Sequence, residues 1–144
     1  MGGRSGAGGG GGGGASAGIS AGVAGVGADL KKQFGLEFKA NGGAGLVTVA
    51  VSVDKVNASW SQDKGFYVAP GGGGQKAANV RSFLDRAAKD GTKVEQSRMS
   101  ITGGVSFTDG RHRFAALRDM GAQSVLVSVP RSEAAAARKQ FGAN

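Results

Sequence analysis

From Leu46 onward the chain alternates apolar and small polar residues, as the stretch LVTVAVSVDKV shows. Residues on one side of an extended chain recur at every second position. On one side of this stretch lie Val47, Val49, Val51 and Val53. Because β-branched side chains favour the extended conformation, we predict a strand with one buried face. The continuous apolar run SVLVSV, closed by Pro130, predicts a second and more deeply buried strand.

A spacing of three to four residues predicts the helices. QKAANVRSFLDRAAKDG ends at Gly91, and its apolar stripe consists of Val80, Phe83, Leu84, Ala87 and Ala88. RSEAAAARKQFG predicts an alanine-rich helix with Ser132 as its N-cap and Gly142 as its stop. A third helix is expected from about Arg111 to Met120, ended by Gly121.

Between these segments, KVEQSRMSI and GGVSFTDG predict two strands joined across Gly103-Gly104. NASWSQDKGFYVAPGGGG is expected to be a loop. Its aromatic residues Trp60, Phe66 and Tyr67 either stack on a base or cap the core. Its glycines after Pro70 either approach a phosphate or form a flexible connector. The order of elements predicts an α/β fold of the α+β kind, with a small mixed sheet and about three helices.

Glycine divides the chain, since 18 of its 29 glycines lie between Gly2 and Gly45. GGRSGAGGGGGGGASAG cannot bury enough side chain to offset its ordering entropy, so we expect it to be disordered in isolation. Ile19 to Phe38 has the spacing of a weak helix or a partner-docking segment. We therefore expect a glycine-rich arm over residues 1–45, able to bind protein partners, ahead of a folded domain over residues 46–144.

Charge and composition limit the classes of function that this chain can have. The net charge is +8, most of it after residue 45, which favours a polyanionic partner such as a nucleotide or nucleic acid. Without cysteine, disulfides, thiolate metal sites and cysteine nucleophiles are excluded. A single histidine excludes a multi-histidine metal site, and we expect no metal. The apolar segment GISAGVAGVGADL is too short to span a membrane, and no secretory signal is expected.

The candidate site is the box Thr108, Asp109, Gly110, Arg111, His112 and Arg113. Here a strand ends in a turn and a helix begins with three basic residues, each costing about 0.3 to 1 kcal/mol against the positive end of the helix dipole. Free first-turn amides and arginine side chains make such a helix start suited to phosphate. The alternative is a solvated basic face, with the arginines paired to Asp109, Asp85 or Asp119 and a structural histidine.

These residues also resemble the ParB/sulfiredoxin-like superfamily, whose members are often labelled ParB-like nuclease domains. The resemblance covers roughly Val47 to Pro130 and is carried by VSVDKV, VRSFLDRAAKDG, MSITGGVSFTDG, the box DGRHRFAALRDMG and SVLVSVP. FYVAPGGGG ahead of a helix is similar to domains of phages and mobile elements. The resemblance implies a protein of the host cytoplasm or of a virion.

In that superfamily the box binds nucleotide phosphates, those of CTP in ParB partition proteins and of ATP in sulfiredoxins. The resemblance implies a nucleoside triphosphate as cofactor, with Gly110 as the motif glycine and His112 and Arg113 as phosphate contacts. Arg111 stands where sulfiredoxins have their catalytic cysteine and ParB proteins usually have glutamate. We therefore expect no sulfinic acid reduction, and CTP hydrolysis is put in question. ParB partition proteins continue into a DNA-binding helix-turn-helix, whereas fourteen residues follow Pro130 here, so sequence-specific centromere binding is not expected.

Two other functions stay open. One is a phage virion or assembly protein that uses the fold as a scaffold and the arm to bind partners, since fold alone does not give function. The other is a small nuclease, for which Asp109 and His112 are the nearest acid/base candidates. No catalytic residue is assigned from the sequence.

Overall fold

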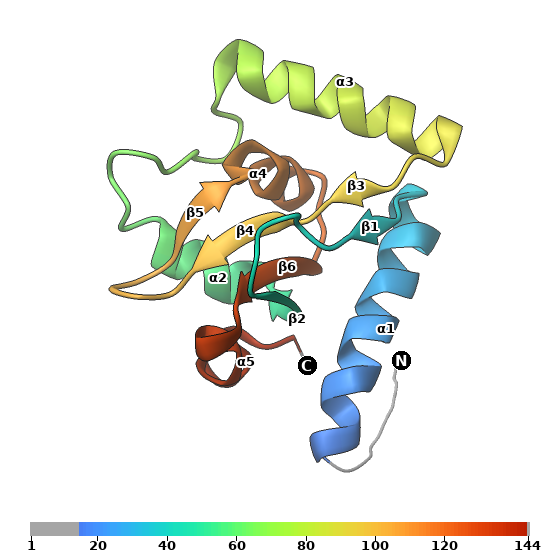
Figure 1. The fold of residues 1–144 in the computed structure, drawn as a ribbon. Coiled ribbons are helices and arrows are strands. Elements are labelled where there is room, and N and C mark those ends of the chain that lie inside the picture. The colour runs from blue at the N-terminus through green and yellow to red at the C-terminus, as the bar shows by residue number, and fades with distance from the viewer. Residues whose placement is uncertain (1–14, 144) are drawn as a thin grey trace.

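The computed structural model describes residues 15–143, with side chains from residue 22 onward (Figure 1). The first part contains α1 (Ala15–Phe34), β1 (Phe38–Lys39), β2 (Leu46–Ser52), α2 (Val53–Trp60) and α3 (Gly74–Asp90). There follow β3 (Val94–Glu95), β4 (Ser97–Ser100), β5 (Ser106–Asp109) and α4 (Arg111–Asp119). The last elements are β6 (Ser124–Pro130), the 3-10 turn η1 (Arg131–Glu133) and α5 (Ala134–Phe141).

The main sheet has four strands in the order β2-β6-β4-β5. β2 and β6 are antiparallel along their whole length, β6 and β4 are parallel, and β4 and β5 are antiparallel. β1 and β3 form a separate parallel pair. The structure thus confirms the small mixed α+β fold. β6 is an inner strand with five buried residues of seven, as its uninterrupted apolar run predicts.

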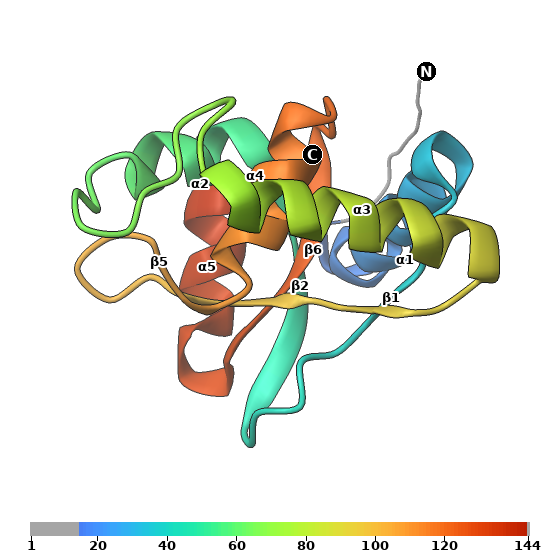
Figure 2. The ribbon, with the colours of Figure 1, turned by 90° about the horizontal axis from the view of Figure 1, so that it is seen from above.

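The helices cover the sheet from several sides. α1 packs against β6 and β2, and α5 packs against β2. Figure 1 shows α3 at one end of the molecule beside α4, with α5 at the opposite end. Seen from above in Figure 2, α3 lies over α4. The pairing of α3 with α4 brings the candidate box next to the glycine-rich loop before α3.

The number of helices differs from the prediction, because the described residues contain five α-helices rather than about three. α2 occupies the beginning of the expected loop. Ser52 caps it by accepting a hydrogen bond of 3.3 Å from the Lys55 amide. The apolar residues Val53, Val56 and Trp60 lie three and four positions apart and are all buried. Val53 continues the alternation predicted for the strand, but it is the first residue of α2, and β2 ends at Ser52.

The packed part of the chain begins ahead of Leu46. Val26, Leu30 and Leu36 belong to the main hydrophobic core, with Leu30 and Leu36 each only 1% exposed. Burial against β2 and β6 therefore supports α1 despite its glycines. The second half of the expected arm is thus part of the fold, whereas most of the glycine tract, residues 1–14, lies outside the described residues.

Ser132 is not the cap of the last helix, which corrects a prediction. It lies exposed in η1, and α5 begins only at Ala134. Glu133 turns away to the β4–β5 connection, where its carboxylate accepts a hydrogen bond of 2.7 Å from the Ile101 amide. Glu133 stands at the N-cap position of α5, and its side chain bonds to the β4–β5 connection instead of capping the helix. Gly142 ends the helix as predicted.

Candidate anion site at the start of helix α4

The predicted strand, turn and helix are present at the box. β5 ends at Asp109, Gly110 takes a left-handed conformation with φ of 79°, and α4 follows at once. A Cβ atom at Gly110 would lie 2.6 Å from Nη2 of Arg113 and 2.8 Å from Oγ of Ser97. Glycine is therefore required here both for its φ and for space. No side chain of the described residues caps this helix start.

The three basic side chains of the box point in different directions. Successive residues of an α-helix project about 100° apart, so neighbours in sequence do not converge on one point. Arg111 reaches the loop before α3, His112 lies against the start of α3, and Arg113 turns back to the sheet. The box thus places one basic residue at each of three contacts, and only part of it remains available to a ligand.

Arg113 is held within the fold. Its Nη2 donates to Oδ2 of Asp109 at 3.1 Å and to the carbonyl oxygen of Gln96 at 3.3 Å. Nδ2 of Asn41 donates to the same carboxylate oxygen at 3.0 Å. Burial disfavours ionisation of Asp109, but the hydrogen bonds from Arg113 and Asn41 outweigh it and lower its pKa. The weighed alternative, pairing with Asp109, is therefore what the structure shows for Arg113.

His112 is enclosed without a hydrogen bond. Both of its ring nitrogens are buried and have no partner among the described residues. The Cβ position of Gly73, the residue before α3, lies only 3.2 Å from Nδ1. Burial lowers the pKa of His112, and the charges of Arg111 and Lys76 lower it further. At pH 7 the imidazole is therefore neutral.

Helix α3 also begins without a cap. Its N-cap residue is Gly73, with φ of 94°, and within this described helix the first turn has no acidic residue and no side-chain cap. Because the backbone of Gly73 lies near the His112 ring, the positive ends of two helix dipoles, each about half an elementary charge, lie close to one imidazole. Sequence reasoning missed this convergence, although the glycines after Pro70 gave a signal for close backbone approach. We call Gly73, Gly74 and residues 110–113 the helix-start junction.

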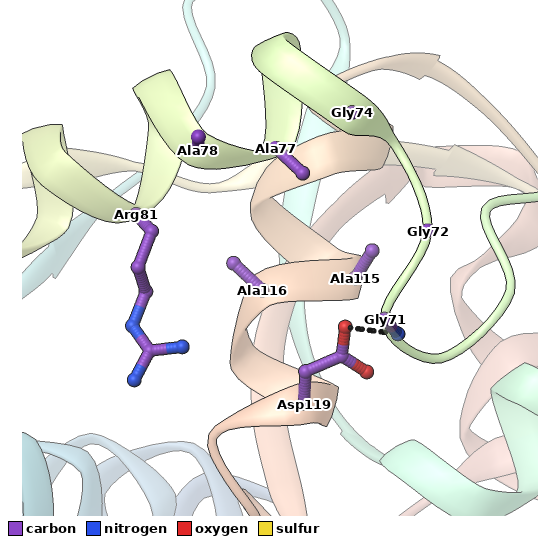
Figure 3. Close-up of a pocket in the computed structure, with 9 residues that line it drawn as sticks. All are labelled: Gly71, Gly72, Gly74, Ala77, Ala78, Arg81, Ala115, Ala116 and Asp119. Atoms are coloured by element: carbon purple, nitrogen blue, oxygen red, sulfur yellow. Dashed lines mark hydrogen bonds between the residues drawn. The ribbon is translucent and has the colours of Figure 1, made fainter.

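A hollow of about 290 Å³ extends from the junction between α3 and α4 (Figure 3). It is lined by the loop glycines Gly71 and Gly72, by Gly74 at the start of α3, by two alanines from each helix, and by Arg81 and Asp119. Oδ2 of Asp119 accepts from the Gly71 amide at 3.1 Å, and Oδ1 accepts from Nε of Arg118 at 2.9 Å. Burial opposes ionisation of Asp119, yet these bonds lower its pKa. The Asp119 carboxylate therefore fastens the glycine loop to α4.

The loop aromatics separate into two groups. Trp60 is completely buried, and its ring meets those of Tyr67, Phe107 and Phe114 edge to face at 4.8 to 5.6 Å. The interpretation as core residues is thus confirmed for Trp60 and Tyr67. Phe66 is 62% exposed instead, with the Arg111 guanidinium carbon 5.3 Å from its ring centroid.

The structure gives less support to acid/base catalysis and to metal binding. Thr108 is exposed on β5, and its part in the site stays a prediction. His112 has no hydrogen-bond partner in the described part of the chain, so Asp109 and His112 do not form a bonded acid/base pair. Residues 15–143 contain no group of three or more His, Asp or Glu side chains able to hold a metal ion. Among these residues, no helix has the length and apolar character needed to cross a membrane.

No protein-family model, curated protein or solved structure matches this chain. The ParB/sulfiredoxin-like resemblance therefore stays a prediction based on the box and on the order of the elements around it.

Proposed function

We propose that this chain binds the phosphate of a nucleotide or nucleic acid at the helix-start junction. The observation that carries the proposal is the meeting of two uncapped helix starts at His112, whose ring nitrogens have no partner among the described residues. Lys76 and Arg111 add full positive charges close enough to influence the pKa of that ring. An anion at this point would interact favourably with both dipoles and both cations.

The junction is unfavourable for the protein alone. Cations in the first turn of α4 oppose its dipole, and each polar group buried without a partner costs about 1 to 3 kcal/mol. Places where a chain departs from the usual helix-end charges and from the pairing of buried polar groups are often functional sites. A phosphate at the uncapped helix starts would offset the repulsion between the first-turn cations and the helix dipole, which supports a ligand-binding role over a purely structural one.

The contacts indicate which groups would bind. A guanidinium carries five N–H donors, and the described contacts of Arg111 use one, at 3.1 Å to the carbonyl oxygen of Phe66. Arg111 and the first amides of α4 are therefore the proposed phosphate donors. Arg113, held by Asp109 and Gln96, is a positioning residue that fixes the turn at Gly110. A nucleoside triphosphate fits this donor set, and no hydrolysis is proposed.

A second candidate is an assembly protein that uses this fold as a scaffold. One observation favours it: Arg113, the basic residue of the box expected to contact phosphate, already has acceptors within the chain. In that case the box would serve the fold alone, and partner proteins would be bound elsewhere.

A titration of the full chain with ATP, CTP and a short single-stranded DNA tests the proposal. Arg111→Ala should weaken binding roughly 10- to 150-fold, the equivalent of one charge-assisted hydrogen bond. Arg131→Ala is the matched control, because Arg131 is an exposed cation in η1, ahead of α5. Rising salt should weaken binding as well. Absence of binding to every probe, or equal effects of the two variants, would reject the proposal and favour the assembly protein.

A further inference from the structure

Phe66 is the most exposed large apolar side chain of the described residues, and it lies next to the proposed phosphate donors. It is 62% exposed, compared with 37% for Phe83, the other large apolar residue on the surface. Nη1 of Arg111 donates to the Phe66 carbonyl oxygen, and the guanidinium lies 5.3 Å from the ring centroid. One arginine thus connects the aromatic ring to the helix-start junction.

The loop that carries Phe66 is fastened on both sides of the ring. The amides of Phe66 and Tyr67 both donate to the carbonyl oxygen of Asp63, at 3.1 and 2.8 Å. The Tyr67 ring packs on buried Trp60, and Arg118 donates to the carbonyl oxygen of Val68. The exposure of Phe66 therefore belongs to a fixed backbone, which presents the ring to solvent while its neighbour enters the core.

We infer that Phe66 is a stacking platform for the base of the bound nucleotide, so that the site recognises a nucleobase together with a phosphate. This inference rests on the proposed function. With the Arg111 guanidinium already over its ring, Phe66 is still 62% exposed, so a second planar group has room to approach it. Every nucleobase has a flat π-face, so stacking on Phe66 requires no particular base.

The charge next to the ring argues for this ligand. A single exposed apolar residue is common on protein surfaces and implies no function. The Phe66 ring, however, lies against the Arg111 guanidinium, and Arg111 is the first residue of α4. Phe83 gives the contrast, because it lies on α3 with no cation over its ring among the described contacts. A ligand that brings a negative phosphate to Arg111 and a planar base to Phe66 satisfies both groups at once.

The test compares ligands with and without a base on the full chain. Binding of ATP, of inorganic tripolyphosphate and of a short oligothymidylate is measured for the unchanged chain, Phe66→Ala and Phe66→Trp. Phe83→Ala is the matched control. Both Phe66 and Phe83 are exposed, so unchanged melting temperatures should show that the variants fold.

We expect ATP and the oligothymidylate to bind more tightly than tripolyphosphate. Phe66→Ala should weaken ATP binding roughly 5- to 150-fold, corresponding to one stacked base. Tripolyphosphate binding should change less than about 2-fold, and Phe66→Trp should preserve the preference for ATP. A larger loss for the oligothymidylate than for ATP would assign the platform to single-stranded nucleic acid, and the reverse would assign it to a mononucleotide.

Two outcomes overturn the inference and are distinguishable. Equal affinity for ATP and tripolyphosphate, with no selective effect of Phe66→Ala, removes the base platform while the phosphate site stands. Binding of none of the three probes removes the platform and the proposed function together.

Discussion

The aromatic core and the helix-start junction lie close together and are built on opposite principles. In the core, Trp60 is enclosed by Tyr67, Phe107 and Phe114, and its stability comes from apolar area removed from water. At the junction, two helix starts lack side-chain caps and the His112 nitrogens have no partner among the described residues. The comparison teaches that the core stabilises the fold through apolar contact, although it also holds the unpartnered Nε1 of Trp60, while the junction has uncapped helix-start amides that a ligand could satisfy.

The largest effect should follow from removing the centre of the core. Trp60→Ala is expected to lower the free energy of unfolding by about 3 to 5 kcal/mol, because it opens a cavity among three rings. Urea denaturation measures the change. Since that loss is comparable with the whole stability of many domains, Trp60→Phe should be made as well, with a loss of roughly 1 to 3 kcal/mol. Phe66→Ala should cost less than about 0.5 kcal/mol, and a similar loss for Phe66 and Trp60 would contradict the comparison.

A smaller effect is expected at the backbone of the junction. Gly110→Ala should destabilise the fold by about 2 to 3 kcal/mol, because it strains a left-handed residue and displaces the Arg113 guanidinium. Gly121→Ala is the control, with φ of 94° and no atom within 4 Å of its Cβ position among the described residues. It should cost only about 1 to 2 kcal/mol. Equal losses would show that the contact with Arg113 contributes nothing.

The contribution of His112 to the free energy of unfolding should depend on pH. Because its pKa in the fold is lowered below 6.5, the unfolded chain binds the proton first as pH falls, and stability decreases from about pH 6.5 downward. His112→Leu should abolish this decrease between pH 7 and 5, since the chain has no other histidine. At pH 7 the variant should be no less stable than the unchanged chain, because it removes two buried nitrogens that have no partner among the described residues. Urea unfolding at several pH values measures it, and a variant with an unaltered pH profile would show that His112 is not held neutral.

A small effect on stability is also expected for the ion pair between Asp109 and Arg113. Asp109 is 51% exposed, so Asp109→Asn should cost less than about 1 kcal/mol. Because its carboxylate repels an anion, the same variant should tighten ATP binding modestly, by about 2- to 5-fold. Asp85→Asn, on the exposed surface of α3, controls for net charge. Tightening by both variants alike would indicate a general charge effect instead of a local one.

Much of the fold could be predicted from local patterns. Hydrophobic periodicity predicted three elements: β2 from its alternating valines, β6 from its apolar run and α3 from its apolar stripe. It could do so because the period of the apolar residues follows the buried side of each element. α2 was missed because Val53 continues the strand pattern of Val49 and Val51. The spacing of Ile19 to Phe38 predicts a weak helix, which α1 confirms. Its glycines lower helix propensity and place it in the expected arm, and packing against β2 and β6 compensates for them.

By itself, the sequence determined the positive charge, the absence of thiol chemistry, and the strand, turn and helix of the candidate box, because these depend on composition and on neighbouring residues. Only the tertiary structure decided that Arg113 returns to Asp109, that His112 is enclosed at Gly73, and that Arg111 meets Phe66. The physical reason is that these contacts join residues from separate elements. Their distances follow from how α3, α4 and the loop pack together, which no local pattern records.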